Sequence, residues 1–128
     1  MPHPADTPET PIPAGYCNLC RRLSGSVAQT WVPVRPDGWK WTASGALELV
    51  RTTGHGCRHM CKRCGTTLTI VYDSQPDCIW PVAGVLDDES LPADIPAALC
   101  RTIHICCVYM QPWFELPDDG MPRLKYAG

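Results

Sequence analysis

Two Cys-x-x-Cys pairs constrain this chain more than any other feature. The first pair is Cys17 and Cys20, and the second is Cys61 and Cys64. A Cys-x-x-Cys turn puts two thiolates on one side of a tight loop, at a separation that suits one tetrahedral zinc ion. Two such turns in a small chain can supply four sulfurs. The sequence therefore predicts a domain organised by Zn²⁺ before it indicates any reaction.

Disulfides and buried free thiols are the competing interpretations of the cysteines. The chain has 9 Cys, an odd number, so they cannot all pair within one chain. Residues 1–13 are polar and proline-rich and contain no apolar segment typical of a secretory signal. We therefore expect a reducing, cytoplasmic compartment, in which paired cysteines hold metal or do chemistry more often than they form disulfides.

Composition limits both the fold and the partners. The chain has 128 residues, of which 45% are hydrophobic, which is enough for one domain with a modest core. The 14 Pro and 10 Gly argue against long helices and favour short strands joined by turns. A net charge of −2 without a long basic run argues against a nucleic-acid partner. No apolar stretch is long enough to span a bilayer, so no membrane partner is expected.

These patterns predict an all-β domain over residues 14–128, preceded by a flexible, proline-rich tail over residues 1–13. Residues 66–72 form the clearest strand because they are rich in β-branched side chains. No amphipathic helix of useful length is expected, and the alternative is a β domain with a few single helical turns. The other predicted strands are residues 28–34, 39–42, 46–52, 79–85 and 102–109, and residues 53–56 are predicted to be a loop.

The motifs, taken in order, resemble the glutathione-dependent formaldehyde-activating enzymes and centromere protein V. The resemblance covers roughly residues 15 to 124, and the order of its motifs is more specific than any one of them. The matching segments are YCNLCRRLSGS (16–26), WKWT (39–42), RHMCKRCGTTL (58–68), AGVLDD (83–88), HI (104–105), PWFEL (112–116) and DGMP (119–122).

The resemblance implies a zinc-binding β domain with a carbon–sulfur lyase activity on the adduct of glutathione, or another thiol, with a small aldehyde or related electrophile. It assigns Cys61 and Cys64 to a structural zinc site. It assigns Cys17 and Cys20 to a second, more open site that would carry the catalysis and where a thiol substrate meets the metal. Cys57, four residues before Cys61, is close enough in sequence to be a third sulfur ligand.

The chain departs from the resembled family in two respects. The family's first thiolate segment usually reads Cys-His-Cys-x-x-Cys, whereas Gly15 and Tyr16 stand at the Cys-His positions here. The family begins with a strand bearing Cys-x-Cys, whereas a proline-rich segment stands there in this chain. Three arrangements stay open: a metal-poor chain, replaced ligands, or two pairs that converge on one zinc. The alternative to an enzyme is a non-catalytic, zinc-stabilised module that binds a partner, or a truncated family member without activity.

The residues that follow the first pair are candidates for substrate binding. A guanidinium at Arg21 can lower the basicity of a nearby thiolate or hold a carboxylate. The resemblance identifies that carboxylate as one of glutathione. Ser24 and Gly25 would then supply a polar approach path to the open site.

Overall fold

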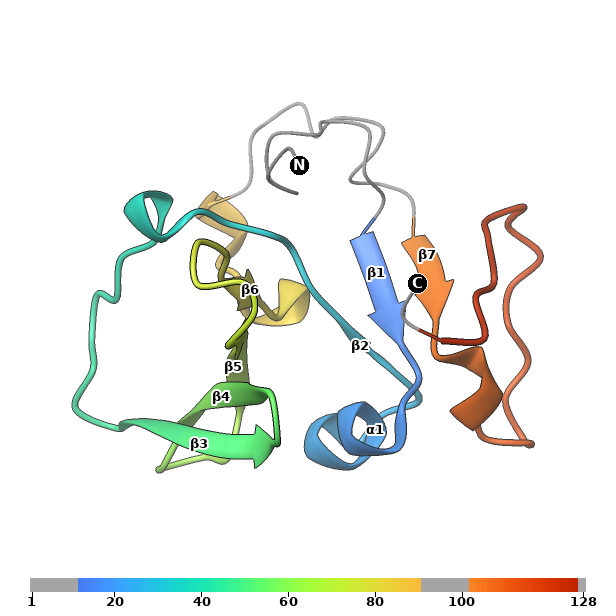
Figure 1. Cartoon of the computed structure of the whole chain (residues 1–128), viewed down its shortest axis with the longest axis horizontal. Coiled ribbons are helices and arrows are strands. Elements are labelled where there is room, and N and C mark those ends of the chain that lie inside the picture. Colours follow the sequence, from blue (N-terminus) through green and yellow to red (C-terminus); the bar gives the residue numbers. More distant parts are fainter. Residues whose placement is uncertain (1–11, 91–101, 127–128) are drawn as a thin grey trace. The chain divides into compact units, whose positions relative to one another are not determined.

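The computed structural model describes residues 12–90 and 102–126. The described residues form two compact units. One unit contains residues 31–90, and the other contains residues 12–30 and 102–126. The secondary structure is mostly β-strands in two sheets, with one α-helix (Figure 1). The predicted all-β class is therefore confirmed.

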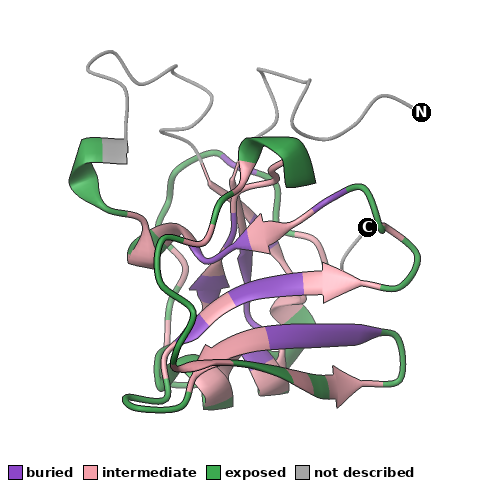
Figure 2. Cartoon of the chain, turned by 90° about the vertical axis from the view of Figure 1, so that its left-hand side faces the viewer, coloured by how far each residue is buried: buried purple, intermediate pink, exposed green. Residues whose placement is uncertain are grey.

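A four-stranded antiparallel sheet forms the first unit, with the strand order β3-β4-β5-β6. Strand β5 pairs with β4 and with the short β6, so it lies inside the sheet, and Thr69 and Ile70 on it are almost fully buried. Much of the buried chain, purple in Figure 2, lies on strands. The bounds are Leu47–Thr53 for β3, Gly56–Cys61 for β4, Thr67–Tyr72 for β5 and Trp80–Pro81 for β6. Short 3-10 helices lie at Pro36–Gly38, Ala83–Val85 and Asp88–Ser90.

A three-stranded sheet forms the second unit, with the strand order β2-β1-β7. Strand β1 (Ile12–Gly15) pairs antiparallel with β2 (Gln29–Thr30) and parallel with β7 (Thr102–Ile105). Helix α1 (Asn18–Ser24) connects β1 to β2. A 3-10 helix (Cys107–Tyr109) follows β7. Because β1 leads directly into α1, this sheet fixes where the first Cys-x-x-Cys pair begins.

Several predicted elements differ from the structure. Helix α1 was not expected, and β4 falls where the pattern predicts a loop followed by a thiolate turn. Residues 39–42 form no strand. The predicted strand at 79–85 shortens to β6 because the chain turns into a 3-10 helix after Val82. Strand β1 starts at Ile12, so the last two residues of the predicted tail are in the sheet, and the rest of that tail lies outside the described residues.

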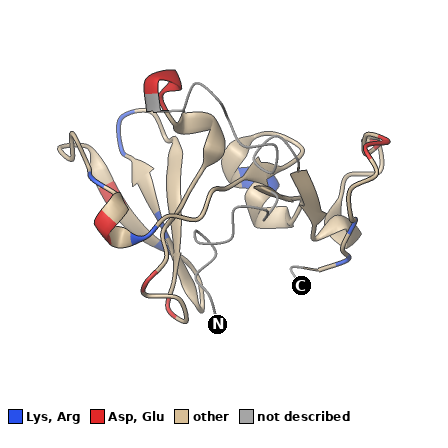
Figure 3. Cartoon of the chain, turned by 90° about the horizontal axis from the view of Figure 1, so that it is seen from above, with Lys and Arg blue, Asp and Glu red and all other residues tan. Residues whose placement is uncertain are grey.

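Within the described ranges, none of the helices has the length and apolar character needed to cross a membrane. Basic and acidic residues are scattered along the chain rather than gathered in one run (Figure 3).

Candidate functional site

The first Cys-x-x-Cys pair forms the start of helix α1. Cys17 has extended backbone angles and is the N-cap residue, and its sulfur accepts a hydrogen bond from the backbone N–H of Cys20 at 3.2 Å. This turn brings the two Cα atoms to 5.2 Å, and the two sulfurs form a disulfide. The two cysteines that were predicted to bind the metal of the open site are therefore close together, and the structure shows them oxidised. Cys20 is buried and Cys17 is half-buried, so Cys17 is the more accessible sulfur.

Helix α1 places Arg21 one turn after Cys17, on the same helical face. Its guanidinium donates to the side-chain oxygen of Asn18 at 2.6 Å, whereas its Nε atom is buried without a hydrogen-bond partner. Gly25 ends the helix with a φ of 67°, and its N–H donates to the carbonyl of Arg21 at 2.8 Å. The Ser24 hydroxyl donates to the same carbonyl at 3.3 Å, so it caps the helix.

A hollow of about 460 Å³ opens beside this end of the helix. Of the three residues predicted to bind substrate, Arg21 and Gly25 line it and Ser24 does not. The segment after β7, which sequence reasoning left without a role, contributes two further side chains. The lining residues are Arg21, Arg22, Gly25, Ser26, Val27, Gln111 and Trp113.

A buried histidine lies next to this site in the same unit. His104, on β7, is 3% exposed; its Nδ1 is 2.9 Å from the Tyr16 hydroxyl and its Nε2 is 2.8 Å from Asp119. Since the carboxylate can only accept at neutral pH, Nε2 carries the proton and Nδ1 accepts from the tyrosine. Tyr16 directly precedes Cys17. This network therefore connects the backbone at the first cysteine to β7 and to the C-terminal segment.

Two pKa shifts follow from this network. Burial, followed by the nearby Cys107 and Asp119, raises the pKa of Tyr16, so the phenol stays protonated as a hydrogen-bond donor. The hydrogen bond from His104, and then the one from the backbone N–H of Met121, hold the pKa of Asp119 below its ordinary value. The sequence pattern showed His104 and Asp119 only as parts of two motifs, and nothing in it indicated that Tyr16 joins them.

The second Cys-x-x-Cys pair occupies the turn after β4, in the other unit. The N–H of Cys61 donates to the carbonyl of Thr66 at 2.9 Å, and the N–H of Gly65 donates to the carbonyl of Cys61 at 2.8 Å. Gly65 has a φ of 77°, which a residue with a side chain rarely adopts. The Thr66 hydroxyl lies 3.0 Å from the Cys64 sulfur, and hydrogen bonds from Thr66 lower the pKa of that thiol. Cys64 is exposed and Cys61 is half-buried.

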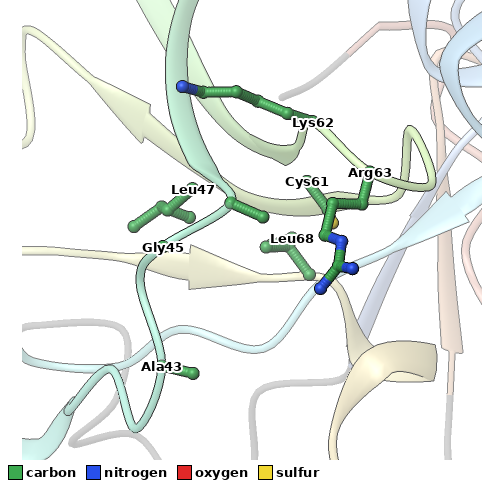
Figure 4. A pocket seen from close by; sticks show the side chains of 8 residues that line it. Ala43, Gly45, Leu47, Cys61, Lys62, Arg63 and Leu68 are labelled. Atoms are coloured by element: carbon green, nitrogen blue, oxygen red, sulfur yellow. The ribbon is translucent and has the colours of Figure 1, made fainter.

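A second hollow, of about 740 Å³, opens beside this turn (Figure 4). Half of its lining residues are aliphatic, and Lys62 extends away from Leu68 in this view. Cys61 is the cysteine that borders it. The lining residues are Ala43, Gly45, Ala46, Leu47, Cys61, Lys62, Arg63 and Leu68.

Cys57 is not brought to the second pair. It is buried near the start of β4, and Cys61 ends the same strand. Four residues of extended chain separate the two Cα atoms by about 13 Å, which is too far for two ligands of one metal ion. No group of three or more potential ligands gathers among residues 12–90 and 102–126. The ligand set Cys17, Cys20, Cys61, Cys64 and Cys57 stays a prediction.

Comparison with known proteins adds one finding to this geometry. The family model for the glutathione-dependent formaldehyde-activating enzyme matches residues 5–106, which is most of the chain and includes both Cys-x-x-Cys pairs. No curated protein matches the chain in a sequence search.

Proposed function

Since the chain belongs to the family of glutathione-dependent formaldehyde-activating enzymes, its role is glutathione-related and of the aldehyde-activating or lyase type. We propose that it is a zinc-dependent carbon–sulfur lyase that makes or breaks the adduct of a small aldehyde with glutathione or a similar thiol. The family match over residues 5–106 is the observation that carries this proposal. The geometry at the start of α1 supports it.

The donor atoms at the first pair suit zinc. In the reduced form, Cys17 and Cys20 present two sulfurs from one turn, which is the spacing that a tetrahedral ion accepts. When bound by few protein ligands, zinc supplies open positions and lowers the pKa of a thiol that occupies one of them. Cys61 and Cys64 offer a second pair, in a turn closed by backbone hydrogen bonds, and this rigidity suits a structural role.

The residues of the chain would bind and orient the thiol. The guanidinium groups of Arg21 and Arg22 provide positive charge for a substrate carboxylate. In the forward direction, the sulfur forms a bond to the carbonyl carbon of the aldehyde and the thiol proton ends on the carbonyl oxygen. The reverse step breaks the carbon–sulfur bond and returns the proton to sulfur. The Tyr16–His104–Asp119 network would hold the backbone at Cys17 in place while this happens.

Exchange of glutathione with formaldehyde, followed by NMR line broadening in the presence of the reduced, zinc-loaded protein, tests this function. We expect acceleration by the unaltered protein and at least about tenfold less with Cys17→Ser, since zinc would lose one of its two sulfurs. Cys106→Ser is the matched control, because Cys106 is a half-buried cysteine of the same unit with no proposed ligand role. Equal rates for both variants would contradict the assignment of Cys17.

Cobalt substitution separates the enzyme from the non-catalytic module. If Cys17 and Cys20 hold an open site, added glutathione will enter the cobalt coordination sphere and change the visible spectrum. A four-sulfur spectrum that ignores glutathione would instead indicate one closed site made by both pairs, with no position for substrate. That outcome would favour a zinc-stabilised β module over a lyase.

A further inference from the structure

The hollow beside the second Cys-x-x-Cys turn has walls that the backbone holds in place. Its volume of about 740 Å³ lies within the range of cavities that hold small ligands. The N–H of Lys62 donates to the carbonyl of Ala46 at 2.8 Å, and the N–H of Leu47 donates to the carbonyl of Ser44 at 3.1 Å. Leu47 also pairs with Cys61 across strands β3 and β4. These contacts join the segment before β3 to the turn after β4, so two walls of the hollow are fixed by the backbone itself.

Aliphatic side chains supply the apolar part of this lining. Leu47 and Leu68 are only half-buried, so water reaches both of them, and two alanines line the hollow beside them. Leu49 lies on the same face of β3 as Leu47 and is 57% exposed. Strand β3 is the edge strand of its sheet, so this apolar surface continues along an edge. A ligand that removed it from water would be stabilised.

Lys62 and Arg63 give the hollow a positive charge. Both are exposed, and no carboxylate within residues 12–90 and 102–126 forms an ion pair with either of them. The described residues that line the hollow include no acidic side chain. In Figure 4 the side chain of Arg63 runs past Cys61 toward Leu68, whereas Lys62 extends away. A guanidinium at the margin of an aliphatic surface can pair with a carboxylate whose alkyl chain covers that surface.

We propose that this hollow binds a small aliphatic carboxylate, with its alkyl chain on Leu47 and Leu68 and its carboxylate on Arg63. The planar fork of a guanidinium matches the two oxygens of a carboxylate, which favours this headgroup. Lys62 adds a second positive charge that repels a cationic ligand. The inference is separate from the proposed function, because it uses neither zinc nor a thiol. It would stand if the chain had no lyase activity.

Calorimetric titration of the reduced, zinc-loaded protein with octanoate tests the inference. We expect saturable binding, and octanoate should bind about tenfold more tightly than hexanoate, because two further methylene groups leave water. Octylammonium has an alkyl chain of the same length and the opposite charge, so it should bind at least about tenfold more weakly than octanoate. Arg63→Gln should weaken octanoate binding about tenfold through loss of a charge-assisted hydrogen bond. Lys40→Gln is the matched control and should bind as the unaltered protein does, since Lys40 is an exposed cation of the same unit that does not line the hollow.

The NMR signals of the leucine methyl groups locate the bound chain. Those of Leu47 and Leu68 should shift as octanoate is added, and shifts confined to other methyl groups would overturn the inference. Equal affinity for hexanoate and octanoate would show that the alkyl chain does not contact the aliphatic wall. Octanoate affinity unchanged by Arg63→Gln would place the carboxylate elsewhere. Either result, or the absence of saturable octanoate binding at millimolar concentrations, would also overturn the inference.

Discussion

His104 has a different partner on each ring nitrogen, and this fixes its tautomer and its orientation. The phenol of Tyr16 donates to one nitrogen, and the carboxylate of Asp119 accepts from the other. The three residues come from the end of β1, from β7 and from the C-terminal segment, so they join parts of the unit that lie far apart in sequence. Buried polar groups of this kind are costly when a partner is removed.

Asp119→Asn should change how stability depends on pH. The pKa of Asp119 is lowered in the folded protein, chiefly by the hydrogen bond from His104. A lowered pKa means that the carboxylate stabilises the fold above its ordinary pKa, near 3.8, and that this contribution is lost as the pH falls through the folded value. The melting temperature of the variant should therefore lie below that of the unaltered protein at pH 7, and the difference should shrink in acid.

The matched control for this prediction is Asp118→Asn. Asp118 is exposed like its neighbour Asp119, but the hydrogen bond with His104 is made by Asp119, so the Asp118 variant should melt at nearly the same temperature as the unaltered protein at both pH values. A difference between Asp119→Asn and the unaltered protein that stays constant from pH 7 to pH 3 would show that the hydrogen bond to His104 does not depend on the ionised carboxylate.

Tyr16→Phe removes the donor to Nδ1 of His104 and keeps the ring that stacks on Phe114. The buried nitrogen would then lack a partner, which should lower the free energy of unfolding by about 1–3 kcal/mol. Chemical denaturation of the reduced protein measures this change. Loss of less than about 0.5 kcal/mol would mean that water replaces the hydroxyl without cost.

Helix α1 shows how short elements depend on their ends. It has seven residues, and an isolated helix of this length is unstable in water. Its start is set by the cap at Cys17, and its end is set by the left-handed backbone at Gly25. Cys17 is a proposed metal ligand and Gly25 lines the hollow, so both caps that stabilise the helix also belong to the candidate site.

Gly25→Ala should destabilise the protein by about 1 kcal/mol, because a φ of 67° disfavours any residue with a Cβ atom. A Cβ there would meet no atom within 4 Å, so the cost comes from the backbone rather than from a clash. Gly84→Ala is the control, since it too has open space around it and lacks a positive φ. Thermal melts of both variants measure the difference, and equal melting temperatures would contradict the role of the left-handed cap.

The sequence predicts elements well where side-chain pattern dominates. Strands β5 and β3 begin within one residue of their predicted starts, because both contain β-branched residues and a glycine turn comes shortly before each. Strand β4 was missed because Gly56–Cys61 has no β-branched residue, and its pairing with β3 and β5 comes from tertiary contacts. Helix α1 was missed because a seven-residue helix defined by its caps leaves little periodic signal.

The residues of the candidate site were also predictable only in part. The cysteine pairs and Arg21 were identified because their chemistry is visible in local spacing. Trp113 and Gln111 were not, because only the folded chain brings the segment after β7 to α1. The hydrogen bonds from Tyr16 to Asp119 span more than a hundred residues and leave no local pattern.

At the scale of the whole molecule, the core of the described chain is small. Its largest fully buried side chains are Ile70, Thr69, Pro81 and Cys78, of which only Ile70 is a large aliphatic residue. Small domains with modest cores often depend on metal or disulfide cross-links for stability. The proposed zinc would therefore contribute to folding as well as to catalysis, since an ion that binds only the folded state stabilises it by mass action.

Zinc should raise the melting temperature of the reduced, metal-free protein. At a free concentration about one hundredfold above the dissociation constant, binding contributes about 2.7 kcal/mol, which for a chain of this size corresponds to about 10 °C.

Cys64→Ser gives the sharpest comparison, because Cys64 is exposed and a serine can keep the contact with the Thr66 hydroxyl. The metal-free variant should therefore melt as the unaltered protein does, and it should lose most of the zinc-dependent increase. Magnesium, which prefers oxygen ligands, should have no effect on either protein. An equal zinc-dependent increase in melting temperature in both proteins would show that Cys64 is not a ligand. The absence of any increase would show that zinc does not stabilise this fold.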